Sequence, residues 1–320
     1  MTLIRMRCSM FALMALSLFG LGTGHAQTDS EKRAATVLFE RFETVAYART
    51  DISGDSTPSG HTYGDSEDNL KLPFMELIGA IRALGPSTAL DLKSRYSSVL
   101  VGAKDFVPPT RIGAVGSHKC YIGILKDGVQ SNAERDFSGV PNETIEGTRV
   151  WTWTVPPSDD ESAPSTYYAA RLEGPYLLMT NNRQDLEDVA KALTSTEGAK
   201  PDSIKVFSWE TLRSHQYWVY RSLRRIGVIS PYASGIGNLG ANVIAMAFFA
   251  DVDKRQGYIR VLTSDRSMKT VPKVLPDAEL NLLQPEGPGI WRARIHLSKD
   301  ALGYKTLFQV FYSFGFGAIL

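Results

Sequence analysis

The sequence predicts an α+β fold that is mainly antiparallel sheet, with several packed amphipathic helices. Strand-like segments come in pairs joined by short turns, and segments with helical spacing of apolar residues are interposed between them irregularly. A doubly wound α/β fold would instead alternate strand and helix regularly. With 320 residues, 43% of them hydrophobic and 22% charged, the chain has an ordinary globular composition and enough length to bury a core.

Residues 1–26 have the three parts of a secretory signal peptide. Arg5 and Arg7 precede an apolar run over residues 10–21, and small residues lead up to Ala26. The run has 12 residues, whereas a membrane-spanning helix needs roughly 18 or more. We therefore expect cleavage after Ala26 and no transmembrane span in the mature chain.

The expected destination is the bacterial periplasm or the extracellular space. The mature chain would carry 33 basic and 34 acidic side chains, which gives no electrostatic footprint for nucleic acid or an anionic membrane. It would keep one thiol, that of Cys120, so an intramolecular disulfide is excluded. Its stability must come from a packed core.

Residues 27–70 form a polar N-terminal segment and loop. Residues 36–49 are rich in apolar side chains, and their pattern leaves helix and strand both open. Residues 51–69 are dense in Asp, Ser, Gly and Thr without apolar periodicity, which is typical of a long loop.

Residues 71–200 form the first expected α+β module. Apolar residues recur at helical spacing over residues 74–84, after Pro73 and before Gly85-Pro86, which predicts an amphipathic helix. Strands are predicted at 97–101, 120–125, 149–155, 167–172 and 176–180. Asn181 or Asn182 can then cap a helix that carries Leu186 and Leu193.

Residues 201–320 form the second expected module. One helical face is predicted to hold Trp209, Leu212, Val219, Leu223 and Ile226. Residues 242–252 and 257–263 predict a hairpin, residues 290–297 a strand, and residues 298–314 a helix capped by its first serine. The apolar residues 308–320 are expected to dock into the core.

The two halves have the same order of elements at one point. The strands at 176–180 and 290–296 are each followed by a capped helix, so they could be corresponding ends of two similar modules divided near residues 197–203. Sequence identity between the halves is negligible. One continuous domain with a large mixed sheet is the alternative.

The loop of residues 51–69 offers a candidate cation site. It carries many hard oxygen ligands, the type that calcium prefers. The candidate ligands are Asp51, Asp55, His61, Asp65 and Asp68. Their spacing is not that of an EF-hand, and an ordinary solvated loop is the competing interpretation. No other cofactor is expected.

Three further motifs have a structural explanation. Residues 235–240 match G-x-G-x-x-G, but they do not follow a strand directly, which argues against dinucleotide binding. His118 and Cys120 suggest a thiol nucleophile, but a cysteine in an apolar strand is typically buried core. Trp151 and Trp153 alternate along a strand and are expected to face the core.

The basic and aromatic segment 213–225 could stack on bases or sugars. Its residues also suit a helix packed on a sheet with its arginines reaching solvent, and we prefer that interpretation.

No motif of a common hydrolase, metalloprotease, P-loop or redox protein occurs, so no catalytic residue is predicted. The leading hypothesis is a non-enzymatic binding or interaction module of the cell envelope, whose partner is an envelope protein or a small ligand. The alternative is an extracytoplasmic hydrolase whose carboxylates are brought together by the fold, because such carboxylates can come from anywhere in the chain.

Overall fold

The structure is a computed structural model. It describes residues 28–49, 95–106, 116–126, 142–145, 147–155, 165–195, 209–222, 243–251, 256–263 and 284–296.

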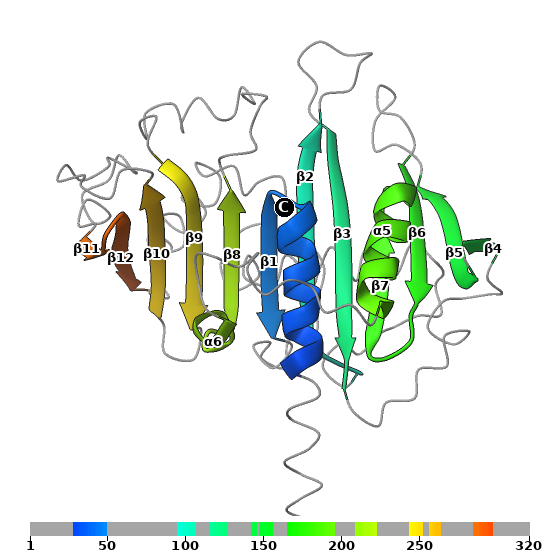
Figure 1. Cartoon of the computed structure of the whole chain (residues 1–320), viewed down its shortest axis with the longest axis horizontal. Coiled ribbons are helices and arrows are strands. Elements are labelled where there is room, and N and C mark those ends of the chain that lie inside the picture. Colours follow the sequence, from blue (N-terminus) through cyan, green and yellow to red (C-terminus); the bar gives the residue numbers. More distant parts are fainter. Residues whose placement is uncertain are drawn as a thin grey trace, which may run out of the picture.

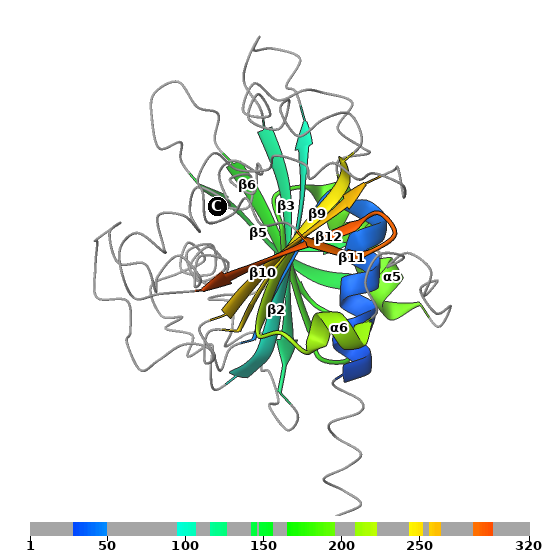
Figure 2. The ribbon, with the colours of Figure 1, turned by 90° about the vertical axis from the view of Figure 1, so that its left-hand side faces the viewer.

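The described strands form one twelve-stranded sheet in the order β11-β12-β10-β9-β8-β1-β2-β3-β7-β6-β5-β4. Every pairing between them is antiparallel. Figure 1 shows the strands side by side across the molecule, and Figure 2 shows the strong twist of the sheet seen along its width.

The strands have the following bounds, taken one half of the sheet at a time. One half has β1 (Thr44–Arg49), β2 (Tyr96–Phe106), β3 (Gly116–Leu125), β4 (Glu143–Ile145), β5 (Thr148–Val155), β6 (Ser165–Arg171) and β7 (Tyr176–Thr180). The other half has β8 (Tyr217–Ser222), β9 (Val243–Asp251), β10 (Gln256–Thr263), β11 (Gln284–Gly287) and β12 (Ile290–His296).

Three helices lie among the described residues, and they are short beside the sheet. They are a helix over residues 28–41, α5 (Arg183–Thr194) and α6 (Trp209–Arg213). The predicted fold class, in which several amphipathic helices pack on the sheet, is therefore wrong. The described part of the protein is mostly antiparallel sheet, and its helices cover only part of one face (Figure 1).

The stretch at 36–49, which the sequence left open, is helix and then strand. The amide of Phe42 donates to the carbonyl of Leu38 at 2.8 Å, which closes the last turn of helix 28–41. β1 begins two residues later at Thr44. The helix buries Ala34 and Val37 as well as Leu38, and Phe39 stacks on Trp218 of β8 with ring centroids 5.7 Å apart.

The register places two sets of side chains on opposite faces of the sheet. Tyr47 of β1 lies opposite Leu100 of β2 on one side and Trp218 of β8 on the other, and all three belong to the core beneath helix 28–41. We call this side the helix face. The other side also carries fully buried apolar residues, among them Val99 and Phe248. Both faces of the central strands are therefore buried.

The helix predicted over residues 209–226 is wrong over residues 214–222, and residues 223–226 lie outside the described residues. Helical structure ends at Arg213, and residues 217–222 form β8. Tyr217 and Val219 point to one face of the sheet and Trp218 to the other, and all three are buried. A strand that is buried on both faces is a continuous apolar run, and periodicity does not separate such a run from a helix.

Several local predictions are confirmed. β9 and β10 pair as the predicted hairpin, and the strand at 149–155 is β5. Asn182 caps α5, and its side chain accepts from the amide of Asp185 at 3.0 Å. The signal peptide, the helix at 74–84, and the C-terminal helix and apolar end lie outside the described residues.

The two halves of the sheet meet at the neighbouring strands β1 and β8. β7 is the third strand beyond β1, through β2 and β3, and β12 is the third strand beyond β8, through β9 and β10. These are the two strands that the sequence places at corresponding ends of two modules. The division into modules stays a prediction.

Candidate functional site

The pair His118 and Cys120 lies on the helix face of β3, beside the start of α5. Cys120 is fully buried, and burial raises the pKa of its thiol far above the ordinary value. A thiol held in its protonated form is neither a nucleophile nor a metal ligand. The prediction that Cys120 belongs to the core is confirmed.

His118 takes part in a polar cluster with two charged residues. Lys104 Nζ lies 2.6 Å from Asp185 Oδ1, and His118 Nδ1 lies 3.5 Å from Asp185 Oδ2. Burial lowers the pKa of His118 more than the Asp185 carboxylate raises it, so the imidazole is favoured in its neutral form. Because Lys104 neutralises the buried Asp185, the cluster ties α5 to β2 and β3, which is a structural task.

A second histidine and aspartate meet where β9 ends. His215 Nδ1 lies 3.2 Å from Asp251 Oδ2, and the amide of Gln216 donates to Asp251 Oδ1 at 3.4 Å. The imidazole packs against Phe249 and Tyr258, with ring centroids 4.9 and 5.9 Å away. Asp251 thereby orients the loop that leads from α6 into β8.

The helix face at β10, β11 and β12 holds a group that we call the arginine face. Its members are Tyr258, Arg260, Glu286, Arg292 and Arg294. Tyr258 pairs with Arg294, and Arg260 with Arg292, so these four side chains share one side of the sheet. In Figure 1 helix 28–41, α5 and α6 lie over more central strands, and no described helix lies over β10 or β12.

Glu286 binds both paired arginines of this face. Its Oε1 atom lies 2.7 Å from Arg260 Nη2 and 3.5 Å from Arg292 Nη1. The Arg292 guanidinium lies over the ring of Tyr258 at 4.2 Å, and that of Arg260 over Phe249 at 5.4 Å. These cation–π contacts fix where the two cations sit.

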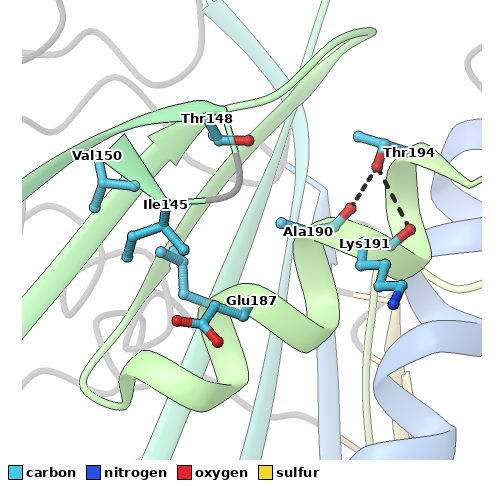
Figure 3. A pocket seen from close by; sticks show the side chains of 8 residues that line it. Ile145, Thr148, Val150, Glu187, Ala190, Lys191 and Thr194 are labelled. Atoms are coloured by element: carbon cyan, nitrogen blue, oxygen red, sulfur yellow. Dashed lines mark hydrogen bonds between the residues drawn. The ribbon is translucent and has the colours of Figure 1, made fainter. Parts of the chain in front are cut away.

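A shallow groove separates α5 from the hairpin of β4 and β5 (Figure 3). Its volume is about 140 Å³, and Ile145, Val150, Leu186 and Ala190 supply its apolar lining. Glu187 is its one carboxylate. A glycosidase site usually has two carboxylates on either side of the scissile bond, so the lining of this groove does not fit a glycosidase.

The other predicted site residues are placed as follows. The candidate cation ligands Asp51, Asp55, His61, Asp65 and Asp68, and the glycine motif at 235–240, lie outside the described residues. Within the described ranges, no three His, Cys, Asp or Glu side chains are arranged to hold a metal ion. Trp151 is buried, and Trp153 stacks on Tyr167 at 5.5 Å.

The described part of the basic and aromatic segment 213–225, which ends at residue 222, is not the predicted helix. Of its residues, Arg213 is exposed at the end of α6, whereas Arg221 in β8 is buried. Trp218 and Tyr220 pack against Phe39 of helix 28–41. These aromatic side chains are part of the core, so they do not form a stacking surface.

The arginine face was not predicted from the sequence. A signal was present, because Tyr258 and Arg260 alternate along one strand and Arg292 and Arg294 along another. Residues two apart on a strand share a face. The missing information was the pairing of these two strands, which a local pattern does not contain.

No described helix combines the length and the apolar character needed to cross a membrane. No protein-family model and no curated protein matches the chain. The solved structures that resemble it include three crystal forms of TP0453. Form I has a TM-score of 0.37 and 9% identity, and form III has 0.41 and 9%, each covering 85% of this chain and 97% of TP0453. Form IV has a TM-score of 0.40 and 10% identity, and the match covers 85% of this chain and 95% of TP0453. Likeness at this level carries no argument about function.

Proposed function

We propose that the chain is an exported, non-enzymatic binding or interaction module of the cell envelope. The signal-like residues 1–26 support export. The observation that carries the binding function is the arginine face, because it presents three cations and an aromatic ring on a part of the sheet that no described helix covers. Such groups recognise ligands by charge and stacking.

Two of the acid–base groups in the described residues also favour binding over catalysis. The Cys120 thiol is buried and protonated, and the Asp185 carboxylate is neutralised by Lys104. Neither group is positioned to exchange a proton with a substrate. A general acid or base has to lie within hydrogen-bond reach of the reacting atoms.

The test of binding is thermal unfolding of the chain from Gln27 to Leu320 with metals, sugars, peptides, nucleotides and phosphates. A ligand that binds only the folded state raises its stability by roughly 2.7 kcal/mol when present at about one hundred times its Kd. We expect one chemical class to raise the Tm. No shift with any class would contradict a small-ligand module and leave a protein partner, which co-purification from the envelope would then have to reveal.

The hydrolase alternative rests on the contact between His215 and Asp251, because a carboxylate that orients an imidazole is an arrangement used in general base catalysis. Its test is turnover of chromogenic ester, glycoside and phosphate substrates by the unmodified chain and by His215→Ala. Turnover that the substitution abolishes would overturn the binding proposal. We expect no turnover from either protein.

A further inference from the structure

We propose that the arginine face binds a phosphate-bearing ligand, and that the Glu286 carboxylate occupies the site in the absence of that ligand. This inference rests on the proposed binding function and names its ligand class.

The sheet register places two arginines side by side, and an anion between them would stabilise the pair. Arg260 and Arg292 are direct cross-strand partners on β10 and β12. Like charges directly opposite each other destabilise a pair of strands. Glu286 supplies this negative charge through a single oxygen that lies within 3.5 Å of both guanidinium groups.

Among the described residues, the arginine face contains more guanidinium groups than carboxylates. Arg294 lies on the same side, opposite Tyr258, and is exposed. Within the described ranges, three arginines therefore share this face with one carboxylate, that of Glu286. A phosphate monoester carries close to two negative charges at neutral pH, and guanidinium groups bind its oxygens in pairs.

Neighbouring groups hold the arginines in place without competing for the anion. The rings of Tyr258 and Phe249 lie beneath Arg292 and Arg260, and they contact the faces of the guanidinium groups, whereas hydrogen bonds to an anion are made at the edges. His215 packs against the same two rings. Asp251, a second carboxylate near this face among the described residues, is buried and bound to His215 and to the amide of Gln216.

The Glu286 side chain lies at a position from which an incoming ligand can displace it. It belongs to β11, a strand of four residues at the edge of the sheet, and the pairing of β11 with β12 is irregular between Pro285 and Gly287. Its side chain is 29% exposed, and that of Arg292 is 41% exposed. An incoming phosphate can replace its oxygen without crossing the core.

The test is titration of the chain from Gln27 to Leu320 with inorganic pyrophosphate by calorimetry, at constant ionic strength. Glu286→Gln removes the competing charge, so we expect tighter binding than in the unmodified protein. Arg260→Gln and Arg292→Gln are each expected to weaken binding about tenfold, because each removes charge-assisted hydrogen bonds. Arg260→Lys keeps the positive charge but lacks the planar guanidinium group. Its affinity for pyrophosphate therefore shows how much of the binding depends on guanidinium geometry and how much on charge alone.

The matched control is Arg149→Gln, which removes an exposed arginine from β5 near the other end of the sheet and should leave pyrophosphate binding unchanged. Each variant's Tm is recorded without ligand, so that weaker binding is read only from variants that remain folded. Binding that is absent from both the unmodified protein and Glu286→Gln overturns the proposal. Equal changes in pyrophosphate binding caused by the Arg260 and Arg292 substitutions and by the Arg149→Gln control also overturn the proposal.

A second arm distinguishes a free phosphate from a lipid headgroup. The protein is sedimented with phosphatidylcholine vesicles that do or do not contain phosphatidic acid. Binding that requires phosphatidic acid and Arg260 assigns the ligand to a lipid, whereas binding to pyrophosphate alone assigns it to a soluble phosphate. If another ligand class raises the Tm and neither phosphate binds, this inference fails and the binding function stands.

Discussion

The chemistry of Cys120 is set by its burial on β3. The side chain is fully enclosed, and enclosure raises the pKa of the thiol. We predict that the thiol of the chain from Gln27 to Leu320 does not react with a chromogenic disulfide reagent in the native state and reacts fully in guanidinium chloride. Rapid reaction of the folded protein would contradict the assignment of Cys120 to the core.

Glu31 makes stability depend on pH. Its carboxylate accepts from Ser98 Oγ at 2.6 Å, but burial outweighs this hydrogen bond and raises its pKa above 4.5. The folded state therefore favours the protonated form of Glu31 more than the unfolded state does. The resulting stabilisation is fully present below pH 4.5 and is lost as the pH rises through the higher folded-state pKa.

Glu31→Gln carries no charge at any pH, so this loss should vanish from its profile. Urea unfolding from pH 4.5 to neutrality should show the variant gaining free energy of unfolding relative to the unmodified protein as the pH rises. A difference that stays constant with pH would contradict burial as the dominant influence on Glu31.

Some of these side-chain environments could be predicted from the sequence, and others could not. The burial of Cys120 followed from its apolar neighbours on a strand. The contacts of His118 with Asp185 and of His215 with Asp251 could not, because each joins residues that are far apart in the chain. The candidate cation ligands of residues 51–68 stay a prediction, since they lie outside the described residues.

Helix 28–41 packs so closely on β2 that it leaves no room for a side chain at Gly102. A Cβ atom at Gly102 would lie 2.6 Å from ring atoms of Phe42 and 2.9 Å from a methyl carbon of Leu38. We predict that Gly102→Ala lowers the free energy of unfolding by about 1–3 kcal/mol, because overpacking forces the helix to shift. The measurement is denaturant unfolding at equilibrium.

Gly287→Ala is the matched control for this contact. A Cβ atom there meets nothing within 4 Å, so the same substitution in β11 should change stability far less. Equal effects at Gly102 and Gly287 would mean that the loss comes from glycine itself and not from the packing of helix 28–41.

The start of α5 depends on its cap. Asn182 accepts from the amide of Asp185, which would otherwise be unsatisfied in the first turn. Asn182→Ala should cost about 1 kcal/mol in free energy of unfolding. Gln184→Ala, two residues further on and exposed, should cost only a few tenths of a kcal/mol, the size of its side-chain contact with Asp188. Equal losses would contradict the capping role.

Prediction of elements succeeded where local chemistry decides and failed where tertiary structure decides. The cap at Asn182 and the hairpin of β9 and β10 have short-range signals in the sequence. β8 has none, because its buried residues face both sides of the sheet, and the run from Trp209 to Val219 could be fitted to a helical period. For this reason the predicted share of helix is higher than the share in the described residues.

The arrangement of the whole sheet depends on pairings between distant segments. β1 pairs with β2 and with β8, which begins more than one hundred and sixty residues after β1 ends. Patterns within a window of ten to twenty residues indicate that strands exist, but not which strand lies beside which. The arginine face exists because β10 and β12 are neighbours, so the proposed binding site could not be predicted from the sequence for the same reason as the topology.

Amide hydrogen exchange of the chain from Gln27 to Leu320, with and without pyrophosphate, tests the central claim most directly. It reports on every strand at once, because a ligand that binds the folded state slows local opening around its site. We predict added protection in β10, β11 and β12, and none in α5 or in the hairpin of β4 and β5. Protection confined to the groove beside α5, or no protection anywhere, would contradict the assignment of ligand binding to the arginine face.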